Sequence, residues 1–289
     1  MDEFKKDKVI RFIARDAEIR GIIGWMPETA ALITKQHNLS EGMGEQLSDT
    51  LLCASMLVQN IKSGALSLRL EAQGIIGLMN VDATPDGFVR GMISKANVED
   101  EAVSRSLKLP MLGNGILTVV KKLHPDKPAY QGVVEVDDVH IAPMVTAYLL
   151  QSEQIKSSVA AATIYENGKL IKCGGFFVEA LPKLKDYDLN KIEENIRNIG
   201  NIKEFISKIE SPEEILEPLM NSLTYDITRE VPIKFFCPCS EEKILLALRA
   251  AGTDEIRSMI SDGKELETYC DYCRKRYAVS VEMLKTILD

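Results

Sequence analysis

Four cysteines in the last 53 residues constrain this 289-residue chain more than any other feature. They form two close pairs, Cys237-x-Cys239 and Cys270-x-x-Cys273, with 30 residues between the pairs. Zinc takes four thiolates tetrahedrally at about 2.3 Å, which requires two such pairs to be brought together by the fold. The spacing therefore predicts a metal site with these four cysteines as ligands and one zinc ion per chain in the reduced protein.

Other possible ligands and nucleophiles are placed elsewhere in the sequence. His37, His124 and His140 all lie in the first half, so four sulfurs alone would fill the coordination sphere. That favours a closed structural site over a hydrolytic site, which keeps an open position. We expect the histidines to be structural or surface residues. Cys53 and Cys173 stand alone in apolar segments, and we expect them to be small core residues rather than reactive thiols.

The composition is that of a globular protein, with 45% hydrophobic and 27% charged residues. The N-terminus has no apolar leader, and nowhere do 18 apolar residues run together. A net charge of −8 weighs against binding to nucleic acid or to anionic membranes. We therefore expect a cytoplasmic protein, and in that reducing compartment a cysteine cluster is more often a metal site than a set of permanent disulfides.

Residues 1–182 are predicted to form an α+β domain of mixed helices and antiparallel sheet. Apolar residues recur at helical spacing over 41–61 behind a possible N-cap at Ser40, and Asn167-Gly168 is a hairpin signal. Strands are predicted around Lys8–Ala14 and at 64–93, 115–121, 130–136, 158–165 and 169–178, with a helix at 141–152.

The composition changes beyond Pro182, where residues 183–230 hold 11 acidic and 7 basic side chains. Ser211-Pro212-Glu213-Glu214 is a specific helix-start signal within this segment. We interpret 183–230 as a charged helical linker that packs weakly on the rest of the chain and is able to detach.

Residues 231–289 are predicted to form a small zinc-binding module. Ser240 can cap a helix over 241–251, a second helix is expected at 254–261, and Ser280 can cap a final short helix. Two short strands at 264–279 would flank the second cysteine pair. The two intervening helices would bring the pairs together.

Two features of this module bear on redox chemistry. Arg274, Lys275 and Arg276 follow the second pair, where positive charge favours thiolate and balances a doubly negative tetrathiolate centre. Each pair is also close enough to oxidise within itself, because residues two or three apart can bring their Cα atoms within the roughly 4.4–6.8 Å of a disulfide. Thiol oxidation could thus eject the metal. A structural zinc module that never changes state remains the simpler alternative.

Several segments resemble one protein family in the right order. The segments FCPCSEE at 236–242 and CDYCRKRY at 270–277 are similar to the C-terminal signature of the redox-regulated 33-kilodalton heat-shock chaperone (chaperonin) family of bacteria. Upstream, GFVRG at 87–91, GNGILTV at 113–119, YQGVV at 130–134, SEQ at 152–154 and GGFFV at 174–178 also resemble family motifs. Two positions depart from the pattern: Glu179 stands where glutamine is expected, and Ile116 where a second glycine is usual.

The resemblance implies a holdase chaperone rather than an enzyme, inactive while reduced and zinc-bound. Oxidation would form Cys237–Cys239 and Cys270–Cys273 disulfides, release zinc, unfold 231–289 and loosen 183–230. A surface on 1–182 would then bind unfolding client proteins. The resemblance also implies that the activated form is a homodimer. ATP is not implied, and the chain has no GxxxxGK[ST] phosphate loop.

Two rival functions remain open. A thiol–disulfide oxidoreductase would use Cys270-x-x-Cys273 as its dithiol, but that motif should open a helix after a strand, whereas here it is predicted in a turn between strands. A zinc-ribbon adaptor would bind nucleic acid or protein in its reduced, metal-loaded state, and the acidic charge disfavours nucleic acid.

Overall fold

A computed structural model of the chain describes residues 7–94, 110–124, 126–137, 140–263 and 265–288. It divides into two compact units, Met1–Phe235 and Phe236–Asp289. The predicted three-part division, with boundaries after 182 and 230, remains a prediction. The first six residues, on which the expectation of no apolar leader rests, lie outside the described residues.

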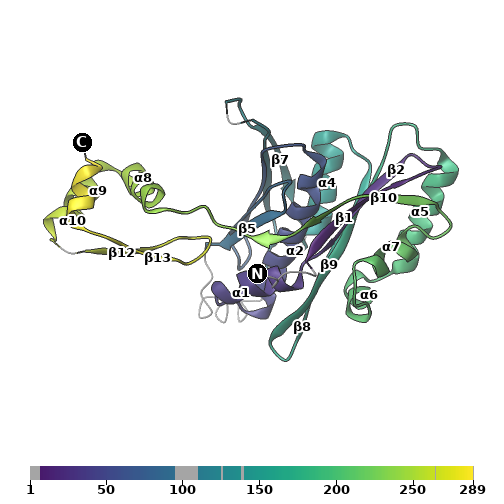
Figure 1. Ribbon diagram of the computed structural model, residues 1–289, viewed down its shortest axis with the longest axis horizontal. Coiled ribbons are helices and arrows are strands. Elements are labelled where there is room, and N and C mark those ends of the chain that lie inside the picture. Colours follow the sequence, from purple (N-terminus) through teal and green to yellow (C-terminus); the bar gives the residue numbers. More distant parts are fainter. Residues whose placement is uncertain (1–6, 95–109, 125, 138–139, 264, 289) are drawn as a thin grey trace. The chain divides into compact units, whose positions relative to one another are not determined.

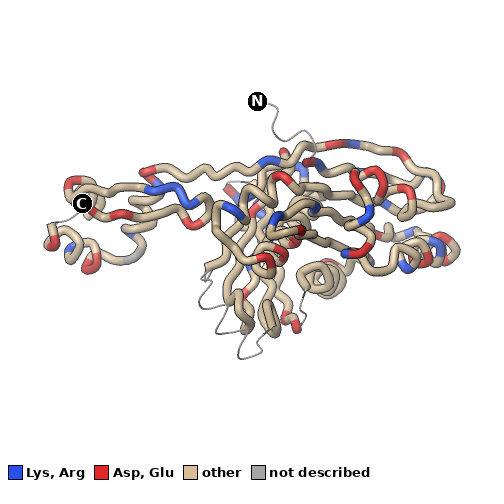
Figure 2. Tube along the Cα trace, turned by 90° about the horizontal axis from the view of Figure 1, so that it is seen from below, with Lys and Arg blue, Asp and Glu red and all other residues tan. Residues whose placement is uncertain are grey.

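Two properties of the described residues bear on possible partners. None of the helices in these ranges combines the length and the apolarity that crossing a bilayer requires. Acidic and basic residues are interspersed along the chain (Figure 2), in keeping with 43 acidic and 35 basic side chains in the sequence.

The first unit contains two sheets (Figure 1). The first sheet has, in spatial order, β10 (Tyr225–Pro232), β1 (Lys8–Ala14), β2 (Ile19–Trp25), β9 (Lys169–Ala180) and β8 (Ser157–Glu166). The second has β11 (Lys234–Phe235), β5 (Phe88–Ile93), β4 (Leu78–Ala83), β3 (Ala65–Ala72), β6 (Gly115–Lys122) and β7 (Tyr130–Val136). Every neighbouring pair is antiparallel except β11 with β5. The predicted α+β class with antiparallel sheets is confirmed.

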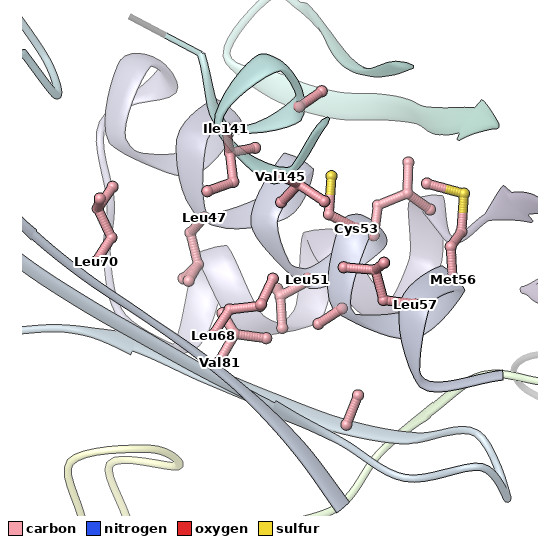
Figure 3. Close-up of a cluster of buried hydrophobic side chains, with 14 of the residues drawn as sticks. Leu47, Leu51, Cys53, Met56, Leu57, Leu68, Leu70, Val81, Ile141 and Val145 are labelled. Carbon is pink, nitrogen blue, oxygen red and sulfur yellow. The ribbon is translucent and has the colours of Figure 1, made fainter. Parts of the chain in front are cut away.

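Helix α2 (Glu41–Leu57) lies between the two sheets and contacts strands of both. It begins where predicted, with the Ser40 hydroxyl accepting a hydrogen bond from the Met43 amide. Its neighbours are α1 (Pro27–Gln36) and α4 (Ile141–Glu153). Figure 3 shows side chains of α2, the second sheet and α4 packed together: Leu47, Leu51, Cys53, Met56, Leu57, Leu68, Leu70, Val81, Ile141 and Val145. This cluster is the main core of the unit.

The hairpin predicted at Asn167-Gly168 joins β8 to β9. Both residues have positive φ, 51° and 77°, which is the backbone that a type I′ turn demands and that Asn-Gly adopts readily. The turn therefore sets the pairing next to it, and the register of β8 and β9 shifts between Ile164 and Tyr165.

The helices of the charged segment cover the other face of the first sheet (Figure 1). They are α5 (Asp186–Ile199), α6 (Ile202–Lys208) and α7 (Glu213–Leu219). They bury a second apolar cluster against the strands, with Ile192, Ile206, Ile215, Leu216, Leu219 and Met220 from this segment and Ile10, Phe12, Ile23, Trp25 and Phe176 from the sheet. The predicted helical segments are confirmed. The expectation of weak packing is wrong, because the helices bury an apolar stripe on the side opposite their charged outer faces.

Two strands fall where helix was expected. Tyr225–Pro232, at the end of the charged segment, forms β10 and pairs with β1 along its whole length. Ile19–Trp25, within a region assigned mainly to helix, forms β2. Both are rich in β-branched or aromatic residues. Pairing with β1 makes them strands, although the surrounding segments have a composition typical of helix.

The second unit follows the predicted order of elements. It contains α8 (Glu241–Ala251), α9 (Thr253–Ser261), β12 (Leu266–Tyr269), β13 (Arg276–Val279) and α10 (Val281–Thr286). Ser240 and Ser280 cap α8 and α10 as expected, accepting hydrogen bonds from the amides of Lys243 and Met283. The buried apolar cluster here is small, with only Ile256, Val279, Leu284 and Ile287 among the described residues.

Candidate metal centre

The four cysteines of the two pairs meet at one point of the second unit. Cys237 and Cys239 lie just before α8, and Cys270 and Cys273 lie in the turn between β12 and β13. The four Sγ atoms all lie within 4.8 Å of one another. The structure therefore brings together the four residues that the sequence singled out.

Local hydrogen bonds shape the turn that carries the second pair. The Cys270 amide donates to the Lys275 carbonyl at 2.9 Å, and the Arg274 amide donates to the Cys270 carbonyl at 2.8 Å. Arg274 adopts a left-handed backbone with φ of 56°, which closes the turn. Near the first pair, Lys243 Nζ donates to the Pro238 carbonyl at 2.7 Å, tying that loop to the start of α8.

The sulfur positions fit a tetrahedral metal ion. Sγ of Cys237 lies 3.7 Å from Sγ of Cys270, and Sγ of Cys239 lies 3.4 Å from Sγ of Cys273. Four thiolates at about 2.3 Å from zinc are about 3.8 Å apart, whereas disulfide sulfurs are about 2.05 Å apart. All four are free cysteines. The quartet is thus able to hold a metal ion, and both short contacts join one pair to the other.

Tyr277 extends the site beyond the cysteines. Its hydroxyl donates a hydrogen bond to Cys239 Sγ at 3.1 Å, and Lys275 Nζ lies 5.1 Å from the centre of its ring. Burial acts to raise the pKa of Cys239, but the hydrogen bonds from Tyr277 and the neighbouring thiols outweigh it and lower that pKa to about 7. Tyr277 was not among the predicted site residues, although its position four residues after Cys273, on the strand leaving the turn, was a usable signal.

The other thiols share the protons differently. Burial raises the pKa of Cys273, and hydrogen bonds with Cys239 and Cys270 reinforce the rise. The environment thus favours the thiolate at Cys239 and the protonated thiol at Cys273. A divalent cation would replace the proton of Cys273 and stabilise all four thiolates together.

Of the three basic residues after the second pair, two have defined partners among the described residues. Arg276 pairs with Glu267 across the β12–β13 ladder, and Lys275 lies over the Tyr277 ring. Their charge is therefore directed partly at side chains beside the site rather than at the sulfurs alone.

The remaining cysteines and histidines lie outside this centre. Cys53 and Cys173 are fully buried in the first unit, where burial raises the pKa of each thiol, in agreement with a core role. His37 is buried, and His124 and His140 are exposed. Over the part of the chain that the structure describes, the quartet is the one group of three or more side chains placed to hold a metal.

Comparisons with known proteins extend over almost the whole chain. A sequence model of the family described as "Hsp33 protein" matches residues 7–280. The 33 kDa chaperonin of Lachnoclostridium phytofermentans is 30% identical over 288 residues, and that of Bacillus subtilis is 28% identical over 291, each match covering 98% of both chains. The crystal structure of the 33 kDa chaperonin of Thermotoga maritima shares the fold, with a TM-score of 0.84 at 24% identity, covering 98% of this chain and 97% of that one.

Proposed function

The chain belongs to the Hsp33 family, whose members are chaperones and not enzymes, and we propose on that premise that it is a redox-regulated, ATP-independent holdase. In the proposed resting state the protein is reduced, and Cys237, Cys239, Cys270 and Cys273 bind one zinc ion. The donor set supports zinc, because four thiolates in a closed tetrahedron suit this metal and leave no open position for hydrolysis.

Oxidation is the proposed switch. Two equivalents of a peroxide accept four electrons from the four thiolates and are reduced to water or hydroxide, while Cys237–Cys239 and Cys270–Cys273 disulfides form. Each sulfur that enters a disulfide loses the negative charge that held the cation, so zinc leaves. The pairing within each motif requires the sulfurs to exchange the contacts they make across the two pairs.

Loss of zinc would then unfold the second unit, 236–289, and loosen 183–230. The apolar face shared by the linker helices and the first sheet would become available to unfolding proteins, which bind through exposed apolar surface. The oxidised protein is proposed to act as a homodimer in the cytoplasm, with unfolded or oxidatively damaged proteins as clients and without nucleic acid or membrane.

One observation carries this proposal: four sulfurs within 4.8 Å of one another lie in a unit whose apolar cluster has only four buried members among the described residues. A unit with so small a core depends on its metal for folding, as small zinc modules do. A metal bound by oxidisable ligands therefore couples the redox state of the cell to the folding of this unit.

The proposal is tested by following zinc release, free thiols and client aggregation in one peroxide titration. The oxidised protein should suppress the aggregation of a chemically denatured client without nucleotide, and the reduced protein should not. Metal analysis of the reduced protein should give one zinc per chain. Cys270→Ser should lower that value sharply, whereas the matched core variant Cys53→Ala should leave it unchanged.

The outcomes separate the alternatives. Equal protection by both forms would remove the switch, and zinc release without any gain of protection would leave a structural zinc module. Turnover of a disulfide substrate without protection would indicate an oxidoreductase. Partner binding by the reduced, zinc-loaded form alone would indicate an adaptor.

A further inference from the structure

Three arginines surround a hollow on the first sheet that plays no part in the metal centre. Arg11, Arg20 and Arg229 lie on β1, β2 and β10, which are neighbours in this sheet (Figure 1). The hollow has a volume of about 400 Å³ and lies entirely within the first unit. A concave site of this size is within the range of small-molecule sites, roughly 300–1,000 Å³.

Strand alternation places the three arginines on the face that α2 covers. The positions two residues away on the same strands belong to the apolar cluster beneath α2: Val9, Ile22 and Val231. Helix α2 is followed by the short 3-10 turn Val58–Asn60, and Asn60 at the end of this turn lines the hollow together with the three arginines. Arg11, Arg20 and Arg229 therefore line the part of the sheet that the helix leaves open.

Two of the three arginines in this hollow have no carboxylate partner among the described residues. Arg11 and Arg229 are directly opposite each other in the β1–β10 register, an arrangement that destabilises a sheet. Within the described ranges, Arg20 pairs with Glu179, but no carboxylate pairs with Arg11 or Arg229. The Arg11 guanidinium instead donates to the Gln59 carbonyl at 2.7 Å. The pKa of Arg11 is lowered, mainly by burial and further by the nearby positive charges of Arg20 and Arg229.

We propose that this hollow binds a small phosphate compound, with Arg11 and Arg229 as its principal ligands. The guanidinium fork matches phosphate oxygens bidentately and stays charged at any physiological pH. Ile13, which is 39% exposed, and the buried Ile22 provide an apolar floor beside the charges. The hollow thus suits either an inorganic diphosphate or a phosphate ester whose organic group rests on that floor. Three cations in one hollow are too few and too local for a nucleic-acid strand.

The test is calorimetric titration of the full reduced protein with orthophosphate, pyrophosphate and adenosine monophosphate at constant ionic strength. Saturable binding is expected, with Arg229→Gln and Arg11→Gln each lowering affinity about tenfold or more, since each removes hydrogen bonds to a charged group. Arg69→Gln is the matched control, an exposed arginine on β3 that pairs with Glu71. Tighter binding of adenosine monophosphate would identify an ester ligand, and tighter binding of pyrophosphate an inorganic one.

Glu179→Gln should change the affinity for phosphate in the opposite direction to the arginine variants. The carboxylate of Glu179 competes with an anion for Arg20, so its neutral isostere should tighten phosphate binding several-fold while preserving the buried shape. Absence of saturable binding by all three compounds would overturn the proposal. Binding that survives in both Arg11→Gln and Arg229→Gln would do so as well. The thermal unfolding of the unliganded variants shows whether each remains folded.

Discussion

The two units of this chain are held together in different ways. The first has two extensive apolar clusters, one around α2 and one beneath the linker helices. The second has one small apolar cluster, with four buried members among the described residues, and four cysteines whose sulfurs lie within 4.8 Å of one another. The first unit is therefore stabilised by burial, and under the proposed function the second depends on a metal whose thiolate ligands are open to oxidation. On that proposal, an oxidant would unfold the second unit and leave the first folded.

Removal of the metal should produce the largest difference in stability between the two units. At about 0.05–0.15 kcal/mol per residue, the 54 residues of Phe236–Asp289 would have only some 3–8 kcal/mol of net stability, whereas zinc contributes apparent energies of about 10–16 kcal/mol to small modules. The two disulfides close very short loops and would restrict the unfolded chain by only about 1.6–1.9 kcal/mol each. Hydrogen exchange after peroxide treatment should show protection lost across the second unit and kept in the strands of the first.

The linker decides how the result is interpreted. Helices α5–α7 share a buried cluster with the first sheet, so their amides are expected to lose less protection than those of α8–α10. If the amides of the second unit stay protected after zinc has left, the metal is not what holds it folded. A chelator in place of peroxide provides the control, since it removes zinc without forming disulfides.

The second prediction concerns that linker cluster. Leu219, at the end of α7, is fully buried, and Leu219→Ala should cost about 2–5 kcal/mol through lost burial and the cavity it leaves. The reduced variant should then release the linker more easily and suppress client aggregation in part. Leu246→Ala is the matched control, because Leu246 on α8 is 63% exposed and its truncation should change little. Unchanged urea unfolding of Leu219→Ala would contradict the packing described for α7.

The sequence specified the second unit almost completely, because local signals determine it. The Ser240 and Ser280 caps and the cysteine spacing all act within a few residues, and each is found where expected. Long-range pairing was less accessible. Strand β10 forms because it pairs with the edge of β1, some 200 residues earlier in the sequence. The residue pattern within 183–230 contains no information about that partner. The arginine hollow was missed for the same reason.

The third prediction uses pH to separate the units. Asp49 on α2 is buried and accepts a hydrogen bond from the Thr163 hydroxyl at 2.7 Å, and burial raises its pKa to about 7. The titratable or polar groups that face it are Glu45, Cys53, Thr163, Cys173 and Lys203. The pKa of Asp49 is thus higher in the folded state than its unfolded value of about 3.9, so the folded state binds the proton more tightly. The resulting contribution to folding stability is fully present below about pH 3.9 and is lost as the pH rises through 7.

The first unit should therefore lose stability between about pH 4 and pH 7, by up to about 4 kcal/mol from Asp49. Asp49→Asn should flatten this dependence in thermal unfolding of the first unit. The second unit should respond with the opposite sign, because protons displace a cation from thiolates and its metal is lost as pH falls. Parallel pH profiles for the two units would contradict the contrast between them.

The smallest expected effect concerns the hydroxyl of Tyr277, which donates to Cys239 Sγ at 3.1 Å. Such a bond favours the thiolate form of Cys239 and fixes the orientation of its sulfur, and comparable partners of metal ligands change affinity about 10–100-fold. Tyr277→Phe keeps the ring and removes only the donor, so zinc affinity in chelator competition should fall by about tenfold, or about 1.4 kcal/mol. The freed sulfur should also react faster with peroxide, so zinc release should accelerate.

Tyr269→Phe is the control that makes the Tyr277 measurement specific to this hydrogen bond. Tyr269 lies on the neighbouring strand β12 and is 51% exposed, so loss of its hydroxyl should alter neither zinc affinity nor release. Folding of both variants is followed by the protection of β13, which the zinc-loaded protein should retain. Equal release rates for Tyr277→Phe and Tyr269→Phe would mean that the hydroxyl only packs beside the sulfur. Faster zinc release from Tyr277→Phe alone would mean that the Tyr277 hydroxyl slows oxidation of Cys239. The rate at which the second unit responds to peroxide would then depend on a side chain that binds no metal.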